Sequence, residues 1–244
     1  MAGTAVRGRL TWETATVGTV MDETPQVRTL SLSVPDWPGH RAGQHVDIRL
    51  TAEDGYTAQR SYSLSAPADG SYLELTVQLV ADGEVSPYLV HDMANGDQLE
   101  VRGPLGGWFV WRADQREPVL LVGGGSGVAP LMAMVRAHRA AASAAPLRLI
   151  YSARTPADVY FGEDLDGKAD VAVLFTRAAP DGGARSPHRI DAADLVEHGW
   201  PADRQPTCYV CGPTSFVEAV TSMLIDAGHA PGRIRAERFG STGG

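Results

Sequence analysis

A glycine-rich turn in the second half of the chain has the composition of a phosphate-binding site. The apolar run 119–122 leads into residues 123–127 (Gly-Gly-Gly-Ser-Gly) and then into a helical pattern. Glycines let a phosphate approach the backbone, and the N–H groups at a helix N-terminus stabilise its charge. The turn is not G-x-G-x-x-G, because Val128 replaces the third glycine, and it lacks the Gly-Lys-Ser/Thr of a P-loop. It predicts a pyrophosphate site, and a strand–helix turn without a ligand is the alternative.

Basic residues follow the next two predicted strands. The segment 151–154 (Tyr-Ser-Ala-Arg) ends one strand, and Arg177 follows the next. In dinucleotide-binding folds an acidic side chain at this place binds the ribose 2′-OH, and basic groups in its stead admit a 2′-phosphate. Ser152, Arg154 and Arg177 therefore favour NADPH over NADH. The alternative is a pair of solvated surface arginines, with Asp158 close enough to weaken their field.

The two cysteines, Cys208 and Cys211, lie three residues apart on a predicted strand. That offset sends their side chains to opposite faces of a sheet, and extended backbone places their Cα atoms about 10 Å apart, too far for a disulfide. A metal or dithiol site is therefore disfavoured, and Cys208 is predicted to lie in the core. Cys211, with Gly212 and Pro213 after it, is predicted to end a parallel strand, where open α/β sheets bind ligands.

Two motifs in the first half are compatible with a flavin. Residues 60–63 (Arg-Ser-Tyr-Ser) begin a predicted strand, and an Arg can bind phosphate, a Tyr can cover a ring system and a Ser can reach a ring nitrogen. Tyr and Ser alternating on a half-exposed strand is the alternative. Residues 83–86 (Gly-Glu-Val-Ser) form a second turn into a helix, which is either an anion site or an ordinary N-cap.

The pattern of elements divides the chain into two parts. Short segments rich in Val, Leu, Thr and Tyr predict an antiparallel barrel or sandwich, interrupted by a helix at 86–93. After 112–118, apolar strands alternate with helical patterns, which is typical of a parallel sheet covered on both faces. We therefore predict two domains, 1–113 and 114–244. The expected strands include 27–34, 45–50, 60–65, 72–79, 97–101, 119–122, 147–151, 171–175 and 207–211, and the later helices are 129–142, 156–165, 191–197 and 215–227.

Composition argues against several classes of function. Among 244 residues, 21 Lys and Arg against 29 Asp and Glu give a net charge of −8, so no nucleic-acid surface is expected. No apolar run approaches the roughly 18 residues of a membrane span and no signal peptide is recognised, so we expect a cytoplasmic protein without a membrane partner. Two cysteines cannot supply the four thiolates of an iron–sulfur cluster. The seven histidines lack metal-ligand spacing and no G-x-S-x-G elbow occurs, so neither a metal site nor a hydrolase is predicted.

Five motifs follow one another along the chain: 60–63 (Arg-Ser-Tyr-Ser), 83–86 (Gly-Glu-Val-Ser), 123–130 (Gly-Gly-Gly-Ser-Gly-Val-Ala-Pro), 211–213 (Cys-Gly-Pro) and 237–240 (Glu-Arg-Phe-Gly). Taken in this order, they resemble the ferredoxin–NADP reductase family over nearly the whole chain. The resemblance implies an N-terminal six-stranded antiparallel Greek-key barrel that binds FAD, followed by a Rossmann-like parallel-sheet domain that binds a nicotinamide nucleotide. The predicted domain boundary agrees with this arrangement.

The resemblance also implies roles by position. Ser63, Cys211 and Glu237 would lie at the reacting rings and act in catalysis. The implied FAD contacts are Arg60, Ser61, Tyr62, Ser63, Gly83, Val85, Ser86 and Phe239. The implied contacts to the nucleotide, NADPH rather than NADH, are Gly124, Gly125, Gly127, Pro130, Ser152, Arg154, Arg177, Cys211, Gly212 and Pro213.

The implied activity is hydride transfer from the nicotinamide C4 to the flavin N5, followed by electron release to an acceptor. Because cluster cysteines are lacking, we expect the acceptor in trans: a ferredoxin-like protein, an oxygenase or another redox enzyme, docked on a basic patch with Arg102, Arg112 or Arg116. Two alternatives are a flavin or small-molecule reductase and a non-catalytic nucleotide-binding module. The motifs at 60–63 and 211–213 disfavour the module, because a sensor needs no flavin beside a nicotinamide.

Overall fold

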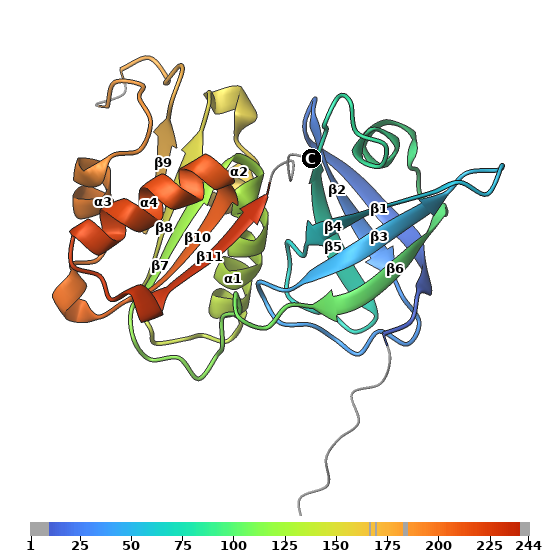
Figure 1. Ribbon diagram of the computed structural model, residues 1–244, viewed down its shortest axis with the longest axis horizontal. Helices are drawn as coiled ribbons and strands as arrows, with labels where there is room; N and C mark the ends of the chain where they lie inside the picture. The colour runs from blue at the N-terminus through green and yellow to red at the C-terminus, as the bar shows by residue number, and fades with distance from the viewer. Residues whose placement is uncertain (1–9, 166, 169, 183–184, 240–244) are drawn as a thin grey trace, which may run out of the picture.

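Two sheets lie side by side in the computed structural model, which describes residues 10–165, 167–168, 170–182 and 185–239 (Figure 1). The first sheet has six antiparallel strands in the order β4-β3-β6-β1-β2-β5. It curls around aliphatic side chains such as Leu30, Ile48 and Leu75, which are fully buried. Alternating burial along its strands is what a sheet with one face on a core requires. The strands are β1 (Glu13–Thr24), β2 (Val27–Ser33), β3 (His45–Thr51), β4 (Thr57–Ser63), β5 (Tyr72–Gln78) and β6 (Gln98–Leu105).

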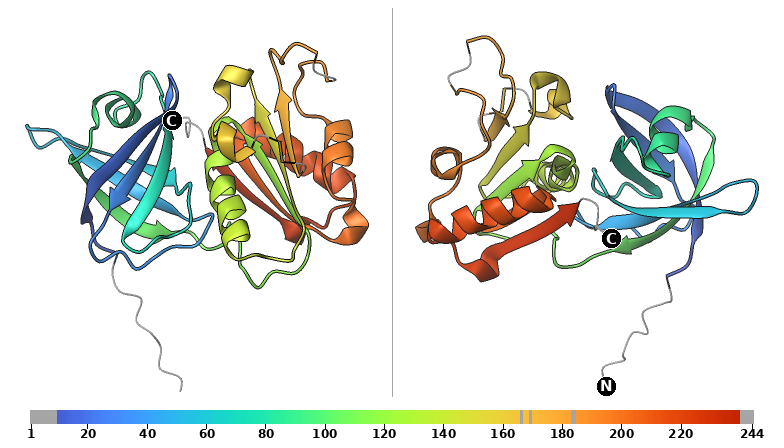
Figure 2. Two further views of the ribbon diagram at one scale, coloured as in Figure 1. Left: turned by 180° about the vertical axis from the view of Figure 1, so that it is seen from behind. Right: turned by 45° about the horizontal axis from the view of Figure 1, so that its top comes forward.

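The second sheet is parallel, with the order β11-β10-β7-β8-β9. Helix α1 packs on one face, and α3 and α4 pack on the other (Figure 2). Strands β8 and β9 are added in sequence on one side of β7, and β10 and β11 are added on its other side. The order in which strands are added therefore reverses between β7 and β10. Open α/β sheets bind ligands at such a point. The elements are β7 (Val119–Gly124), α1 (Val128–Ala140), β8 (Leu147–Ala153), α2 (Gly162–Leu165), β9 (Val171–Phe175), α3 (Ala192–His198), β10 (Thr207–Pro213), α4 (Thr214–Asp226) and β11 (Ile234–Phe239).

The fold class predicted from the sequence is confirmed, and some elements differ. Strands β1 and β11 add to those expected; β1 is polar and contains two register shifts that interrupt its alternation. The helix expected at 86–93 is present over residues 86–92, and Tyr88–Asp92 within it form a π-helical turn. The helix expected at 156–165 divides into a 3-10 turn, Pro156–Asp158, and α2, because Phe161 between them has a φ of +59°. No helix in the described part of the chain is long and apolar enough to cross a bilayer.

A partly buried ion pair and a backbone hydrogen bond hold the two domains together. Arg136 on α1 reaches Glu74 on β5 at 2.6 Å, and Asp164 on α2 holds the same guanidinium at 2.7 Å from within its own domain. The Glu23 carboxylate on β1 accepts the backbone N–H of Phe161 at 2.9 Å. The contacts of Glu74 and Glu23 cross between the domains, so they fix the spacing between the barrel and the parallel sheet. The predicted boundary at 113/114 lies in the connection between β6 and β7, and its position stays a prediction.

Candidate functional site

The glycine-rich turn lies where the building direction of the parallel sheet reverses. It joins β7 to α1, and a Cβ on Gly127 would lie 2.1 Å from the Cys211 carbonyl oxygen, so only glycine fits there. Gly125 has a φ of +55°, and a Cβ on it would meet nothing within 4 Å. The turn is therefore pressed against β10 at one glycine and open at the other, where a ligand can approach the backbone.

A cavity of about 570 Å³ opens beside this turn. The backbone N–H of Arg177 donates to the Arg154 carbonyl oxygen at 2.9 Å, so both arginines leave the rim from adjacent points. Six residues predicted to bind the nucleotide line the cavity: Gly124, Gly125, Ser152, Arg154, Arg177 and Pro213. Four others are buried outside its lining: Gly127, Pro130, Cys211 and Gly212.

Arg189 also lines the cavity, and the sequence reasoning missed it. It lies in the loop between β9 and α3. Among the described residues, Arg154, Arg177 and Arg189 form no ion pair within 4.0 Å. Asp158 lines the same cavity and accepts a hydrogen bond from the Thr155 hydroxyl at 2.6 Å. In the sequence, Arg189 is only a basic residue before a predicted helix. Its place at the cavity depends on β9 being the edge strand, which positions the loop after it.

The barrel motif 60–63 lies on the edge strand β4, and the motif 83–86 contacts it from a turn after β5. Arg60 Nη2 lies 3.2 Å from Glu84 Oε2, and the Tyr56 hydroxyl donates to the same carboxylate at 2.6 Å. Glu84 belongs to the turn 83–86, so this contact joins that turn to the strand. The Arg60 side chain is 54% exposed. The Arg60 guanidinium is therefore accessible from solvent.

Other residues of these motifs are engaged within the barrel. Ser61 Oγ donates to Asp47 Oδ1 at 2.6 Å, and Ser86 Oγ accepts a backbone N–H across its own turn at 3.0 Å. The Val85 side chain is fully buried, so only its backbone can meet a ligand. Tyr62 is half-buried, and burial raises the pKa of its phenol above the usual range, so the hydroxyl stays protonated.

The two domains meet at the residues predicted to act in catalysis. On the barrel, Ser63 pairs with His45 between β3 and β4. On the parallel sheet, Glu237 pairs with Cys211 between β10 and β11. His45 Nδ1 lies 3.7 Å from Glu237 Oε1, so these residues form one row across the junction. The sequence reasoning missed His45, because a single histidine at a strand start gives no local signal.

Burial governs how these groups titrate. It raises the pKa of Glu237 to about 7. It raises the pKa of the Cys211 thiol well above its usual value, and the neighbouring Glu237 carboxylate raises it further, so the thiol is neutral at pH 7. Burial also lowers the pKa of His45, and Asp47 offsets part of this effect. Cys211 is fully buried and packs under α1, whereas Cys208 packs on the other face of the sheet, as predicted.

The terminal motif reaches the same junction. Phe239 is half-buried, pairs with Pro213 at the end of β10 and packs against the core beneath α1. Its predicted contact with the flavin stays a prediction. Gly240, the last residue of that motif, lies outside the described residues.

Three features of this region fit a flavin and a nicotinamide nucleotide. The cavity joins an open glycine turn to three arginines, as the phosphates of a dinucleotide require. Arg60 beside the turn 83–86 gives a second anion-binding point, on the barrel. Between them, His45 Nδ1 and Glu237 Oε2 are buried without a hydrogen-bond partner in the described parts of the chain. Polar ring atoms of bound cofactors would satisfy such groups.

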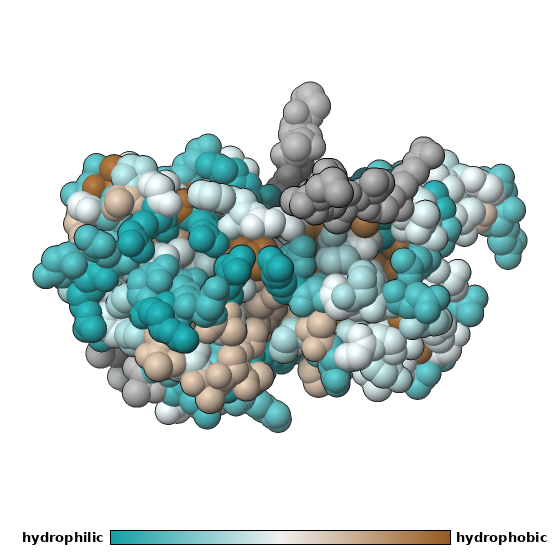
Figure 3. All heavy atoms as spheres, turned by 90° about the horizontal axis from the view of Figure 1, so that it is seen from below, coloured by the Kyte–Doolittle hydropathy of each residue, from teal (hydrophilic) through white to brown (hydrophobic). Residues whose placement is uncertain are grey.

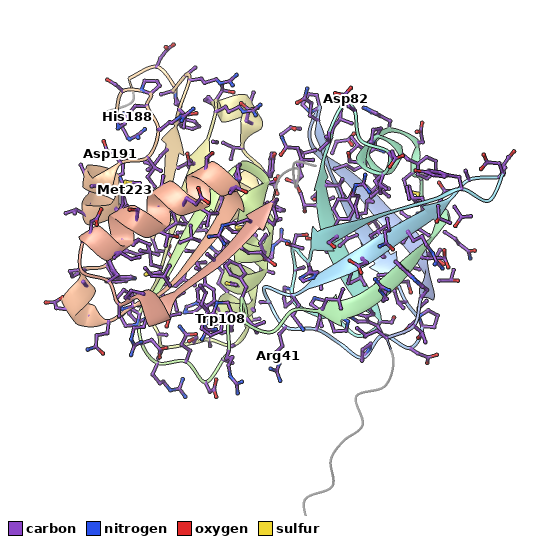
Figure 4. All side chains as sticks on the ribbon, viewed as in Figure 1. Arg41, Asp82, Trp108, His188, Asp191 and Met223 are labelled. Atoms are coloured by element: carbon purple, nitrogen blue, oxygen red, sulfur yellow. The ribbon has the colours of Figure 1, made fainter. Side chains whose placement is uncertain are left out.

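One group of possible metal ligands lies among the described residues, on the far side of the parallel sheet from the barrel. It consists of His188, Asp191 and Asp194 (Figure 4). The guanidinium of Arg185 holds both oxygens of Asp194, at 2.6 and 2.8 Å, and Asp191 and Asp194 form the capping box of α3. These carboxylates already have structural partners.

The chain matches two family models, one for each domain. Residues 15–110 match the oxidoreductase FAD-binding domain, and residues 121–222 match the oxidoreductase NAD-binding domain. Together with the fold and the junction, these matches define a two-domain flavoprotein oxidoreductase that uses a pyridine nucleotide.

Several curated proteins are similar over most of the chain. The reductase subunit of an aromatic O-demethylase from Amycolatopsis sp. is 33% identical, over 97% of this chain and 73% of its own length. The ferredoxin--NAD(P)(+) reductase component of naphthalene 1,2-dioxygenase/salicylate 5-hydroxylase systems from Ralstonia sp. is 28% identical, over 93% of this chain and 69% of its own length. A flavohemoprotein from Pseudomonas putida is 32% identical, and the chain spans 50% of its length. The chain belongs to the ferredoxin–NADP reductase-like family, and the prediction of a flavin-dependent NAD(P)H reductase is confirmed.

Solved structures agree with the fold. The FAD/NAD-binding domain of nitric oxide dioxygenase from Vibrio cholerae has a TM-score of 0.81 at 23% identity, covering 94% of this chain and 99% of that domain. A cytochrome P450 reductase from Amycolatopsis has a TM-score of 0.78 at 30% identity, covering 97% of this chain and 73% of that one.

Proposed function

We propose that this protein reduces its bound FAD with NADPH and passes the electrons to a separate redox protein. The observation that carries the proposal is the contact between the domains, where Glu237 of the parallel sheet faces His45 of the barrel. Ser63 and Cys211 flank this contact, one from each domain. A flavin on the barrel and a nicotinamide at the ends of the parallel strands would meet there, as hydride transfer requires.

The bound cofactors supply the hydride chemistry, and the chain supplies position and charge. Arg60 binds the FAD diphosphate from the edge of the barrel. Gly125 opens the turn to the nucleotide diphosphate. Cys211 presents a neutral thiol beside Glu237 and adds no charge next to the reacting carbon. The ion pair between Arg136 and Glu74 keeps the two domains, and so the two rings, at a fixed spacing.

Absorption spectroscopy tests this function directly. After incubation with FAD and removal of the excess, the protein should show a bound-flavin spectrum, and anaerobic NADPH should bleach it at lower concentration than NADH. A protein that retains no FAD contradicts the whole proposal. A flavin bleached equally by both coenzymes contradicts only the choice of NADPH.

The choice of NADPH rests on the three arginines of the cavity. Arg154, Arg177 and Arg189 come from three loops or strand ends and converge on one space. Positive charge gathered there suits a 2′-phosphate, because hydrogen bonds between guanidinium and phosphate are charge-assisted. One carboxylate oxygen of Asp158 accepts a hydrogen bond from the Thr155 hydroxyl. Asp158 therefore repels a bound 2′-phosphate less than a carboxylate directed at the 2′ position would.

The acceptor we propose is an acidic electron-transfer protein. The relative from Ralstonia is named as the reductase component of dioxygenase and hydroxylase systems, and the relative from Amycolatopsis as the reductase subunit of an aromatic O-demethylase, which supports a protein partner. A surface made of Arg41, Trp108 and Arg235, here called the junction surface, suits an acidic partner although the chain as a whole carries −8. Arg112, which was expected in such a patch, lies 3.2 Å from the Asp114 carboxylate and is paired with it. Trp108 is 62% exposed and lies 5.4 Å from the Arg235 guanidinium.

This surface adjoins the junction between the domains. Trp108 comes two residues after Gly106, where a Cβ would lie 3.2 Å from the His45 ring, and Figure 4 shows Trp108 and Arg41 below the junction. From that side, Figure 3 shows a largely hydrophilic face with hydrophobic areas near the middle. Arg102, one of the arginines expected in such a patch, donates instead to Asp47 at 2.6 Å and stacks on Trp12.

Replacing Trp108 with alanine and Arg41 with glutamate should slow electron transfer to a small acidic [2Fe–2S] ferredoxin by about tenfold, because an exposed aromatic anchor and a complementary charge are lost. Reduction of a neutral quinone should stay unchanged, since a small acceptor needs no docking surface. The matched control is Val196→Ala, which removes an exposed apolar side chain on α3. Equal rates with the ferredoxin before and after the double change would place docking elsewhere, and a quinone preferred over every protein tested would favour a small-molecule reductase.

A further inference from the structure

His45 is directed at the other domain by the local structure of the barrel. The register of β3 against β6 shifts between His45 and Asp47, and such a bulge redirects a side chain at a strand start. Gly106 leaves room for the ring, because a Cβ on Gly106 would lie 3.2 Å from His45 Nδ1. Among the described residues, Nδ1 is buried without a hydrogen bond, and the carboxylate it faces is that of Glu237.

Glu237 is the counterpart of His45 on the parallel sheet. Its Oε2 is also buried and without a hydrogen bond in the described residues, and its Oε1 lies 3.7 Å from His45 Nδ1. That distance is longer than a hydrogen bond, and a side-chain shift of about 0.8 Å would close it. Hydrogen bonds in active sites commonly tighten when ligands bind.

We propose that His45 is the proton partner of Glu237, and that this pair carries one proton between solvent and the reacting rings in each reductive cycle. The proposal rests on the proposed function, because it needs a flavin and a nicotinamide at the junction. His45 is a positioning and proton-exchange residue in this scheme, acting through Glu237.

The proton balance of the reaction requires such a group. Reduction of a flavin by NADPH transfers a hydride, which is two electrons and one proton, and takes up one further proton; both protons leave when the two electrons pass singly to an acceptor. The Glu237 carboxyl releases its proton towards the rings and becomes a carboxylate. The neutral His45 ring takes up a proton from solvent and passes one from Nδ1 to that carboxylate, which leaves the ring neutral again. The His45 side chain is 27% exposed, which gives it access to solvent.

The surrounding charges are compatible with this exchange near neutral pH. Burial raises the pKa of Glu237 to about 7, so its carboxyl loses a proton as the pH rises through neutrality. Burial lowers the pKa of His45, and Asp47 on the same strand partly offsets this; Arg102 of β6 donates to Asp47 at 2.6 Å. Cys211 on β10 is a neutral thiol. The other titratable side chains next to Glu237 along β11 are Arg235 and Arg238.

An NMR titration tests the coupling between the two groups without turnover. In FAD-bound protein isotopically labelled at the glutamate carboxyls, the titration midpoint of Glu237 should move to higher pH when His45→Gln is introduced, because the carboxylate loses the ring N–H that stabilises it. The control is His91→Gln, which changes an exposed histidine on the π-helical turn and should leave the Glu237 midpoint as in the wild type. A Glu237 midpoint that His45→Gln leaves unchanged would overturn the proposal.

The pH profile of flavin reduction gives a second test. With saturating NADPH, the reduction rate should fall as the pH rises through the range in which Glu237 ionises. Glu237→Gln should abolish this pH dependence and slow reduction by roughly 100-fold, the range typical for loss of a general acid. His45→Gln should move the midpoint to higher pH, because the carboxylate loses the N–H that stabilises it. His91→Gln is the control.

The two proposals fail in different ways. If the protein takes up no FAD, or if its bound flavin stays oxidised in the presence of NADPH, the proposed function is wrong. Normal FAD content and normal reduction, with the same midpoint in wild type and His45→Gln, refute the role of His45 alone. A structural role for His45 would lower stability or FAD content without moving that midpoint.

Discussion

With Arg154 and Arg177 both replaced by alanine, the KM for NADPH should rise by about 100-fold while the KM for NADH stays within about threefold. A hydrogen bond to a charged group contributes about 1.5–3 kcal/mol, and exposure of both arginines reduces this figure. If each of the two lost contacts contributes about 1.4 kcal/mol, each raises the KM about tenfold, and together they raise it about 100-fold. NADH has no 2′-phosphate, so its binding does not depend on these two contacts. Steady-state kinetics with a neutral quinone as acceptor measures both constants.

The controls for this experiment come from the same domain. Arg189→Ala should raise the KM for NADPH by about tenfold, as one charge-assisted contact predicts. Arg204→Ala removes the same charge from an exposed arginine that stacks on Trp200, and it should change neither constant. Equal increases for NADPH and NADH in the double variant would show that these arginines hold a part common to both coenzymes.

The sequence predicts best those parts of the site whose geometry is local. The run 119–128 specifies a strand, a tight turn and a helix through its own residues, and the structure places its glycines at the cavity and against β10. Cys208 and Cys211 lie on opposite faces because the strand period is two, which needs no knowledge of the rest of the fold. Arg154 and Arg177 follow from the same reasoning, because parallel strands end at one edge.

The residues that were missed depend on contacts between distant segments. His45 acquires its position from a bulge against β6 and from Glu237, which lies almost two hundred residues later in the chain. Arg189 reaches the cavity because β9 is the edge strand. Strand β11 carries charged residues at alternate and adjacent positions, so its periodicity is weak, and pairing with β10 decides its structure. Local pattern does not contain these relations.

Gly127→Ala should destabilise the protein by about 3 kcal/mol, because overpacking a rigid contact costs about 1–3 kcal/mol or more and this one is with backbone. A Cβ there would lie 2.1 Å from the Cys211 carbonyl oxygen and 2.7 Å from the Gly212 Cα, and no side-chain rotation relieves either contact. For a chain of this size that loss lowers Tm by roughly 6–12 °C. Thermal unfolding followed by circular dichroism measures it.

Gly232→Ala is the matched control, because a Cβ on Gly232 meets nothing within 4 Å, and its stability should stay within about 0.5 kcal/mol of wild type. If Gly127→Ala unfolds at the same temperature as this control, the turn is not pressed against β10. Where the Gly127→Ala variant remains folded, relief of the contact has to move the turn away from Cys211, and Cys211 is the strand partner of Glu237. Flavin reduction by NADPH should then slow in the Gly127→Ala variant and not in the control, because the nucleotide turn and the row of residues across the junction are held in place by the same backbone contact.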